Sequence, residues 1–411
     1  MFNKTKAKWK RKINKLKNKV KMNLYKKHWA NKVKVDPNLI LFESMLGRNY
    51  SCNPKAIYEE MLRQGLDQKY TIYWVVTSMN LEIPGNCRKV KRNSFKHLYL
   101  LCKAKVWIFN TRQPNYVIKN PETIYLMTWH GTPLKKLALD MDDVVMAGNK
   151  GIESYKANFW KNSRRWDYLC AQNKYSSDIF KNCFDFHKTM LECGYPRNDT
   201  LINNNNQVYI NAIKEKHGIP KDKKVILYAP TWRDDQSIGK GKYIFKPNMN
   251  FDLMKRKLAK DYVFIIKYHY LIASKIDWTR FEGFIYDIKE DIQDLYLISD
   301  MMMTDYSSVM FDYSCLKRPM LFYTYDLDQY FGNRGFYFDF IEEAPGPFLY
   351  NTEELVEFLQ NPNFEQYQEK YDAWYNKFNK WDDGKASEKI VNMLIDHMNQ
   401  PTVTEEQVEA Q

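Results

Sequence analysis

The chain has 411 residues, of which 44% are hydrophobic and 27% charged, and its net charge is +14. That length is sufficient for two domains with separate cores. No apolar run approaches the ~20 residues that cross a bilayer, and no uncharged apolar core of a signal peptide follows the basic N-terminus. Seven scattered cysteines, odd in number and without a C-x-x-C pair, favour a reduced cytoplasmic compartment and exclude a structural zinc site.

Residues 1–35 form a basic arm that contains 14 Lys or Arg residues and no acidic residue. The remaining 49 basic residues equal the 49 acidic ones, so the net positive charge belongs to this arm. Its apolar residues follow helical spacing and form one stripe: Phe2, Trp9, Ile13, Leu16, Val20 and Leu24. A basic amphipathic helix of this kind is typical of a segment that lies in an anionic membrane surface.

Two alternatives compete with a membrane role for the arm. Its lysines could be the polar face of a helix that packs on the protein. They could also neutralise nucleic-acid phosphates, but the rest of the chain has no helix-turn-helix, zinc or RNA-recognition pattern. We therefore expect no nucleic-acid partner and a peripheral protein at the cytoplasmic face of the cell membrane.

From residue 36 onward, short apolar runs alternate with helical stretches. The first half contains six strand candidates: Leu39–Phe42, Thr71–Val76, Val106–Phe109, Ile124–Met127, Tyr168–Cys170 and Met190–Cys193. Continuous apolar strands separated by helices indicate a parallel sheet that is covered on both faces. A turn-rich break then runs from Gly194 to Asn206.

The same pattern restarts after the break. Its strand candidates are Val225–Tyr228, Tyr262–Ile266, Phe284–Tyr286, Met301–Thr304 and Met320–Tyr323, with helices that include Phe251–Lys260 and Ser307–Leu316. We predict an α/β protein of two doubly wound, Rossmann-like domains, residues 36–205 and 206–399, that face a cleft, with C-terminal helices and a disordered tail at 400–411. Ligands in such folds bind at the carboxyl ends of the strands.

The segment TWHGTPLKK, from Thr128 to Lys136, follows one of these strands. His130 is the titratable residue at the strand end, and we expect a tight glycine turn and a helix that opens with Pro133 after it. Free backbone N–H groups at a helix start bind phosphate, and a histidine beside them suits proton removal. Alternatively, the histidine only satisfies a hydrogen bond of the turn.

Strands of the second half also end in polar clusters. One strand is followed by Tyr228–Asp234 and the next by Lys267–His269, while Thr304 precedes Asp305, Ser307 and Ser308 in the first turn of an expected helix. One such cluster is an ordinary helix cap. Three at one sheet edge, together with Arg233, Lys267 and His269, favour a diphosphate site.

These motifs resemble the CDP-glycerol glycerophosphotransferases of teichoic acid synthesis, which have a GT-B-type fold. The resemblance extends from about Leu39 to Asn392 and rests on four ordered motifs: TWHGTPLKK, GYPRND, YAPTWRDD, and SDMMMTDYSSVMFDYSCLKRP followed by RGFYFDF and PGP. It implies a membrane-associated transferase that moves glycerol phosphate from CDP-glycerol to a hydroxyl of a polyprenyl-diphosphate-linked saccharide acceptor and releases CMP. The first domain would then take the acceptor and the second the CDP-glycerol.

The resemblance also implies residue roles. His130 would be the general base, and the substrates would be bound by Trp129, Gly131, Thr132, Pro133, Arg197, Pro230, Thr231, Arg233, Lys267, His269, Asp305, Ser307 and Ser308. No cofactor is implied. Asp140 to Asp143 and Asp234-Asp235 could bind a divalent cation, but acidic surface turns are commoner and no metal site is indicated.

Other functions remain compatible with the same residues. A CDP-ribitol or capsule-polymer phosphotransferase would use the same phosphate-binding groups, as would an ordinary sugar-nucleotide glycosyltransferase. A noncatalytic module that binds membranes or nucleic acid through the arm is the rival of another class. The acceptor, the number of units added and the oligomeric state are left open by the sequence.

Overall fold

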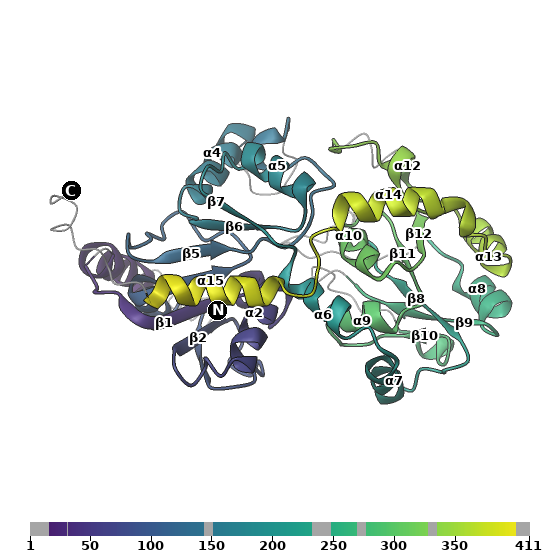
Figure 1. Ribbon diagram of the computed structural model, residues 1–411, viewed down its shortest axis with the longest axis horizontal. Helices are drawn as coiled ribbons and strands as arrows, with labels where there is room; N and C mark the ends of the chain where they lie inside the picture. The colour runs from purple at the N-terminus through teal and green to yellow at the C-terminus, as the bar shows by residue number, and fades with distance from the viewer. Residues whose placement is uncertain are drawn as a thin grey trace, which may run out of the picture.

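The structure is a computed structural model, and it describes residues 16–30, 32–143, 151–231, 248–268, 277–327 and 335–399. The chain forms two lobes that lie side by side, each built on a parallel β-sheet with helices on its faces (Figure 1). The predicted fold class, two Rossmann-like α/β domains, is confirmed.

The first domain contains a seven-stranded sheet in the order β3-β2-β1-β4-β5-β6-β7, with all neighbours parallel. Its strands are β1 (Asp36–Glu43), β2 (Thr71–Val76), β3 (Cys87–Lys91), β4 (Ala104–Phe109), β5 (Ile124–Met127), β6 (Tyr168–Ala171) and β7 (Thr189–Glu192). Its helices are α2 (Cys52–Arg63), α3 (Phe95–Lys103), α4 (Ile152–Ser163) and α5 (Lys174–Cys183), with the short turns η2 (Met45–Gly47) and η3 (Ala138–Asp140).

Both faces of this sheet are buried because its central strands contain continuous apolar runs, such as Leu39–Phe42 in β1 and Val106–Phe109 in β4. In β1, Leu39 and Leu41 enter one hydrophobic cluster, while Ile40 and Phe42 enter the cluster on the opposite face. Successive side chains of a strand point to opposite faces, so a continuous apolar run requires cover on both.

The second domain contains a six-stranded parallel sheet in the order β10-β9-β8-β11-β12-β13. Its strands are β8 (Lys224–Tyr228), β9 (Tyr262–Ile266), β10 (Ile285–Tyr286), β11 (Met301–Thr304), β12 (Met320–Tyr323) and β13 (Phe348–Leu349). Its helical elements are α6 (Asp199–Asn203), α7 (Gln207–Lys216), α8 (Phe251–Leu258), η6 (Thr279–Phe281), α9 (Ile292–Ile298), α10 (Val309–Tyr313), η7 (Ser314–Leu316), α12 (Phe340–Glu343), α13 (Thr352–Gln360), η8 (Glu365–Tyr367) and α14 (Gln368–Phe378). The short turn η4 (Pro196–Asn198), which precedes α6, packs against α2 and so belongs to the first domain.

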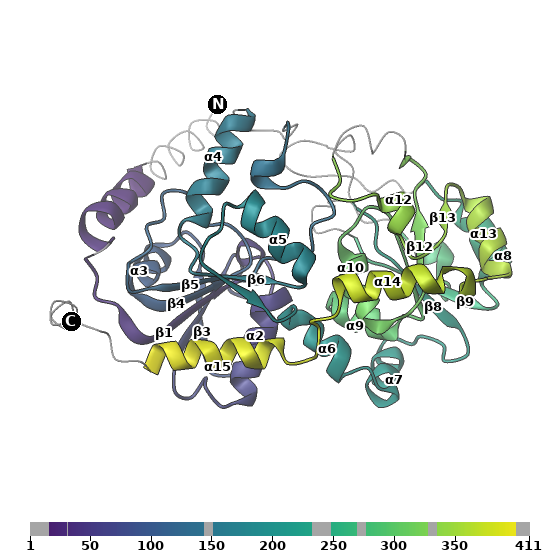
Figure 2. The same ribbon diagram turned by 45° about the horizontal axis from the view of Figure 1, so that its top comes forward.

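The last helix, α15 (Ala386–Asn399), returns to the first domain (Figure 2). The range predicted for the second domain, residues 206–399, includes this helix. Its Ile390, Leu394 and Met398 instead pack in the hydrophobic cluster that also contains Ile57 and Tyr58 of α2. The chain therefore crosses between the domains twice, near residue 196 and near residue 382.

The described part of the arm is helical from residue 16 to 24 and continues as the wider turn η1 (Tyr25–Trp29). Tyr25 is fully buried, and its hydroxyl accepts a 2.6 Å hydrogen bond from the Ile118 N–H. Leu16 and Val20, which belong to the predicted apolar stripe, are 64% and 47% exposed. The described part of the arm is thus anchored to the body at its end, while Leu16 and Val20 are exposed to solvent. Among the described residues, no helix is long and apolar enough to span a bilayer.

Three local expectations differ from the structure. The sequence did not predict the edge strands β3 and β13. Three of the five residues of β3 are charged, and β13 has only two residues. The helix expected at Pro133 is also absent. Instead, the Lys136 N–H donates to Gly335 O and the Tyr337 N–H donates to Leu134 O, so this stretch pairs with an extended segment of the second domain.

Candidate active site

A cavity of about 530 Å³ lies between the two domains. Its lining comes from the loops that follow strands of both sheets, at the carboxyl edges where ligands of doubly wound folds bind. The first domain contributes Met45, Asn49, Ser51, Cys52, Thr111, Arg197 and much of the loop from Trp129 to Leu137; the second contributes Ala229, Pro230, Thr231, Lys267, Tyr268, Asp291, Ile292, Gln293, Tyr296, Tyr306, Ser307, Ser308, Val309 and Asp312.

The loop after β5 carries the histidine and is held by side chains from elsewhere in the fold. Trp129 has a positive φ of 51°, a conformation that costs an ordinary residue free energy and needs support. Asn53, at the start of α2, supplies that support: its Nδ2 donates to Thr128 O at 3.0 Å and to Trp129 O at 3.3 Å. The position of His130 is thus set by the turn that Asn53 stabilises.

The imidazole of His130 lies at the cavity wall with one nitrogen already bonded. Its Nδ1 is 2.7 Å from the carbonyl oxygen of Asn110, and the ring stacks on Trp129 with centroids 4.6 Å apart. A carbonyl can only accept, so Nδ1 carries the hydrogen and Nε2 is left with a lone pair. The pKa of His130 is lowered to about 4: burial is the largest cause, the hydrogen bond to Asn110 opposes it, and the cations of Arg197 and Arg112 add to the lowering. The ring is therefore neutral at physiological pH.

The next residues of the loop connect the domains. Thr132 Oγ1 donates to Gln172 Oε1 at 2.6 Å, and Gln172 Nε2 donates in turn to Phe311 O and to Asp382. Gly131 faces Ser308, where an added Cβ would lie 3.0 Å from the serine Oγ. Glycine at this position lets the histidine loop approach the start of α10.

The second-domain wall presents polar groups after β8, β9 and β11. Thr231 donates from both its N–H and its Oγ1 to the buried carboxylate of Asp305, at 3.0 Å. Lys267 Nζ donates to Glu290 O at 2.6 Å, and burial lowers the pKa of this lysine. Ser307 and Ser308 lie before α10 and are partly exposed to the cavity. The wall combines a cation with hydroxyl groups, a combination that suits phosphate oxygens.

Arg197 is buried between the domains. Its Nη2 lies 3.0 Å and 2.7 Å from the two carboxylate oxygens of Asp312, and its Nη1 donates to His130 O at 2.9 Å. The GYPRND motif that contains it also fixes the crossover: Asp199 accepts from the N–H groups of Ala386 and Ser387 at the start of α15.

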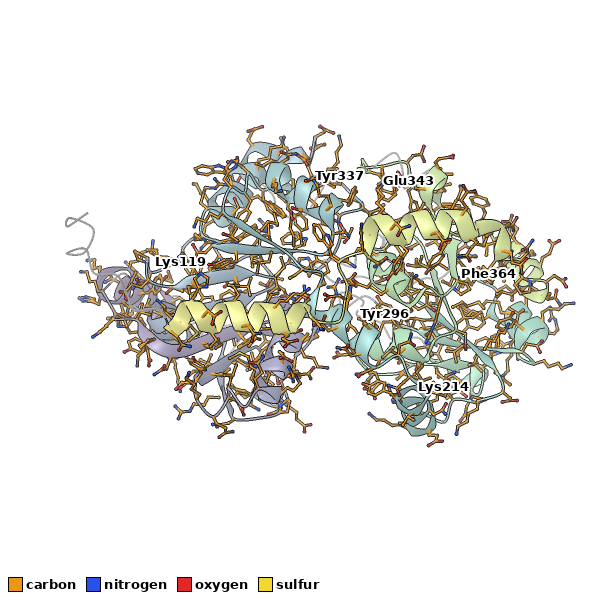
Figure 3. All side chains as sticks on the ribbon, in the orientation of Figure 1. Lys119, Lys214, Tyr296, Tyr337, Glu343 and Phe364 are labelled. Carbon is orange, nitrogen blue, oxygen red and sulfur yellow. The ribbon has the colours of Figure 1, made fainter. Side chains whose placement is uncertain are left out.

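Two cavity residues outside the predicted set stand out because each has a buried polar atom without a hydrogen-bond partner in the described part of the chain. These atoms are Gln293 Nε2 and Tyr296 Oη. Gln293 is 6% exposed and Tyr296 is fully buried, and Figure 3 shows Tyr296 near the boundary between the lobes. A buried donor without a partner costs about 1–3 kcal/mol, so such groups indicate a place where a ligand supplies the partner. Their isolated positions in the sequence gave no signal of this.

The structure brings most of the predicted site residues to one cavity. Those that line it are Trp129, His130, Gly131, Thr132, Pro133, Arg197, Pro230, Thr231, Lys267, Ser307 and Ser308. Asp305 lies behind this wall and holds Thr231. Arg233 and His269 lie outside the described residues. Within the described ranges, no group of three or more His, Cys, Asp or Glu side chains is arranged to hold a metal ion.

Comparisons with known proteins agree with this architecture. Residues 24–396 match the family model described as CDP-Glycerol:Poly(glycerophosphate) glycerophosphotransferase. The chain is 45% identical over 395 residues to the teichoic acid poly(glycerol phosphate) polymerase of Bacillus subtilis (strain 168), covering 94% of this chain and 52% of that protein. It is 44% identical to the teichoic acid glycerol-phosphate transferase of Staphylococcus aureus (strain NCTC 8325 / PS 47), covering 87% of this chain and 93% of that one.

A solved structure is similar over nearly the whole chain. It is a variant of the wall teichoic acid polymerase TagF soaked with CDPG, with a TM-score of 0.87, 41% identity and coverage of 97% of both chains. The chain spans only about half the length of the Bacillus subtilis relative. The family model nevertheless covers both domains, the cavity between them and all four predicted motifs, as the motifs led us to expect. The chain therefore belongs to the CDP-glycerol:poly(glycerophosphate) glycerophosphotransferase family, a family of transferases.

Proposed function

We propose that this protein transfers glycerol phosphate from CDP-glycerol to a hydroxyl of a polyprenyl-diphosphate-linked teichoic acid precursor and releases CMP. The observation that carries the proposal is the state of His130: it lies at the cavity wall between the domains, neutral, with Nδ1 bonded to Asn110 O. Its Nε2 is then available to accept the proton of the attacking hydroxyl. Family membership and the CDPG-soaked relative support CDP-glycerol as the donor.

In the proposed reaction, the acceptor hydroxyl approaches from the first domain. Its oxygen forms a bond to the phosphorus that carries glycerol, its proton passes to His130 Nε2, and the bond from that phosphorus to the oxygen of CMP breaks. The site accelerates the reaction by positioning the two reactants and by stabilising the charge on the phosphate oxygens. No covalent intermediate is needed.

The second-domain wall is proposed to hold the diphosphate. Lys267 supplies a positive charge, and Ser307 and Ser308 supply hydroxyl groups. Thr231 is a proposed part of the same wall, with its N–H and Oγ1 donating to Asp305. Arg233 and His269 remain proposed ligands of the same group. Gln293 Nε2 and Tyr296 Oη are proposed to donate to the bound donor, which would satisfy two atoms that have no partner in the described structure.

The arm is proposed to bring this site to the acceptor at the cytoplasmic face of the membrane. Leu16 and Val20 are exposed on a lysine-rich helix whose end is anchored to the body by Tyr25. Exposed apolar side chains on a basic helix suit the interface of an anionic bilayer.

CMP release tests the function. The purified protein is given CDP-glycerol with and without a detergent-dispersed polyprenyl-diphosphate-linked saccharide that ends in glycerol phosphate. The proposal expects CMP only when the acceptor is present, together with a lipid product heavier by whole glycerol phosphate units. CMP release from CDP-ribitol at a higher rate than from CDP-glycerol would instead establish the ribitol alternative, and transfer of a sugar from a sugar nucleotide would establish a glycosyltransferase.

A further inference from the structure

We propose that Asp312 and Arg197 act together as a positioning pair that fixes His130 from across the domain boundary. The inference rests on the proposed function of His130 as the base. It assigns Arg197 a task other than contact with the donor phosphates, and it gives Asp312 a role that its position in the middle of α10 does not suggest.

The contacts of Arg197 argue against a role as a simple ligand of the donor phosphates. Its Nη2 is used by the two Asp312 oxygens, and its Nη1 by His130 O and by Cys52 Sγ at 3.1 Å. The guanidinium also lies over the Tyr195 ring, 4.9 Å from its centroid. Both terminal nitrogens of the guanidinium are thus occupied by protein groups, and Asp312 already balances its charge, while Nε has no hydrogen-bond partner among the described residues.

The pair joins elements that belong to different domains. Arg197 comes from η4, which leads out of the first sheet, while Asp312 lies on α10, directly after the β11 end that carries Ser307 and Ser308. The carbonyl that Arg197 holds belongs to His130 itself. A change in the distance between the domains would therefore move the base relative to the proposed phosphate site, and the ion pair fixes that distance.

The ion pair between Arg197 and Asp312 is buried, and this bears on its proposed role in fixing the distance between the domains. The side chains of Arg197 and Asp312 are 8% and 6% exposed. A buried ion pair adds little net stability compared with apolar side chains of the same shape, but loss of one partner leaves an uncompensated charge. The pair is therefore better explained by the geometry it imposes than by the stability it adds.

The test compares three changes at the pair with a matched change elsewhere. Arg197→Lys keeps the charge beside Asp312 but lacks the fork that reaches His130 O at the same time. Asp312→Asn keeps the shape of the acceptor and removes its charge. The double variant Arg197→Met/Asp312→Leu removes both charges and retains an apolar contact. Asp167→Asn is the control, because its ion pair with Lys119 lies within the first domain, and Figure 3 shows Lys119 toward the far end of that lobe.

Each variant is measured for thermal stability, for CDP-glycerol affinity by calorimetry and for kcat of CMP release. We expect the double variant and Arg197→Lys to remain folded and to bind CDP-glycerol within about twofold of the unmodified protein, while kcat falls about 10- to 100-fold. The acid limb of kcat/KM should also move to higher pH in the double variant, because the Arg197 cation no longer opposes protonation of His130. Asp167→Asn should change stability alone.

Each of the following results would overturn the inference. Recovery of full kcat by the double variant would make the pair a packing contact only. A loss of CDP-glycerol affinity in Arg197→Lys that equals the loss in kcat would make Arg197 a donor ligand. If His130→Ala, measured in parallel, kept full activity, the proposed function of the base would fail and this inference with it. An inactive His130→Ala together with fully active pair variants would contradict the inference alone.

Discussion

The two walls of the interdomain cavity are built differently. On the first-domain wall, consecutive carbonyls around the histidine are already bonded: Asn53 holds Thr128 and Trp129, and Arg197 holds His130. On the second-domain wall, Gln293 and Tyr296 keep buried polar atoms without partners in the described structure. The bonded carbonyls of the first wall gain few hydrogen bonds from a ligand, whereas the unpartnered atoms of Gln293 and Tyr296 gain them on binding. Changes to the first wall should therefore alter the rate, and changes to the second should alter donor affinity.

The largest effect is expected from His130→Ala. Loss of a general base typically costs ~10²–10⁴-fold in rate, so kcat for CMP release should fall by that factor. CDP-glycerol affinity should change little, because the histidine lies on the first-domain wall, opposite the proposed diphosphate site. Calorimetry and steady-state CMP release measure the two quantities. The exposed His187→Ala serves as the control, and a His130→Ala protein with near-normal kcat would contradict the base role.

Asn53→Ala should lower both rate and stability. Its amide bonds two carbonyls and accepts from the Arg197 N–H, so its removal leaves buried groups without partners, at a cost of about 1–3 kcal/mol in the free energy of unfolding. The turn at Trp129 then loses its support, and we expect kcat to fall about tenfold through misplacement of His130. Asn162→Ala, at another buried asparagine, should lose stability and keep kcat. Equal kcat in both variants would show that the Asn53 contacts do not position the base.

The described part of the arm does not line the cavity, so substitutions in it should affect delivery of the acceptor and leave the chemical step intact. Leu16→Glu/Val20→Glu places charge on the exposed stripe, while removal of residues 1–35 would also uncover the buried Tyr25 site. Co-sedimentation with phosphatidylglycerol-containing vesicles should fall several-fold, because apolar insertion is lost and two basic charges are offset. Val208→Glu, at an 82% exposed position of the second domain, is the control. Unchanged sedimentation of the double variant would exclude this stripe from membrane contact.

Tyr296→Phe should give the smallest effect and the one most specific to the second wall. Removal of a buried hydroxyl that has no partner should leave stability unchanged or raise it. If that hydroxyl donates to the bound donor, CDP-glycerol affinity should fall about 2- to 10-fold. Tyr125→Phe, at another unpartnered hydroxyl that lies in the first-domain core, should leave affinity unchanged. Equal affinity in the two variants would remove Tyr296 from the donor site.

The sequence predicted the fold well because the central strands are apolar on both faces. It failed at β3, where Arg88, Lys89 and Lys91 reflect an edge strand in solvent, and at Pro133, where backbone pairing with residues 335–337 overrides the local preference for a helix. The two failures have different origins: the apolar pattern of β3 is hidden by charged residues at the sheet edge, whereas the pairing partner of the Pro133 stretch lies far along the chain.

For the candidate site, too, the sequence predicted local motifs but not contacts between residues that are distant in the sequence. Strand-end motifs identified the residues that line the cavity, because their chemistry is local in the sequence. The contact between Arg197 and Asp312 joins positions 115 residues apart, and nothing in a single sequence links them. The unpartnered atoms of Gln293 and Tyr296 likewise become visible only when burial and hydrogen bonds are known.

The most direct test of the account is the state of the His130 ring, because the account requires a neutral base with its lone pair on Nε2. A ¹⁵N-histidine NMR titration of the full chain, with His130 assigned by comparison with His130→Ala, reports both tautomer and pKa. We predict an Nδ1–H tautomer and a pKa near 4, so that the ring stays neutral as the pH falls from 7 to 5 and becomes protonated only below that range. An Nε2–H tautomer, or a pKa at or above the ordinary ~6.5, would contradict the account.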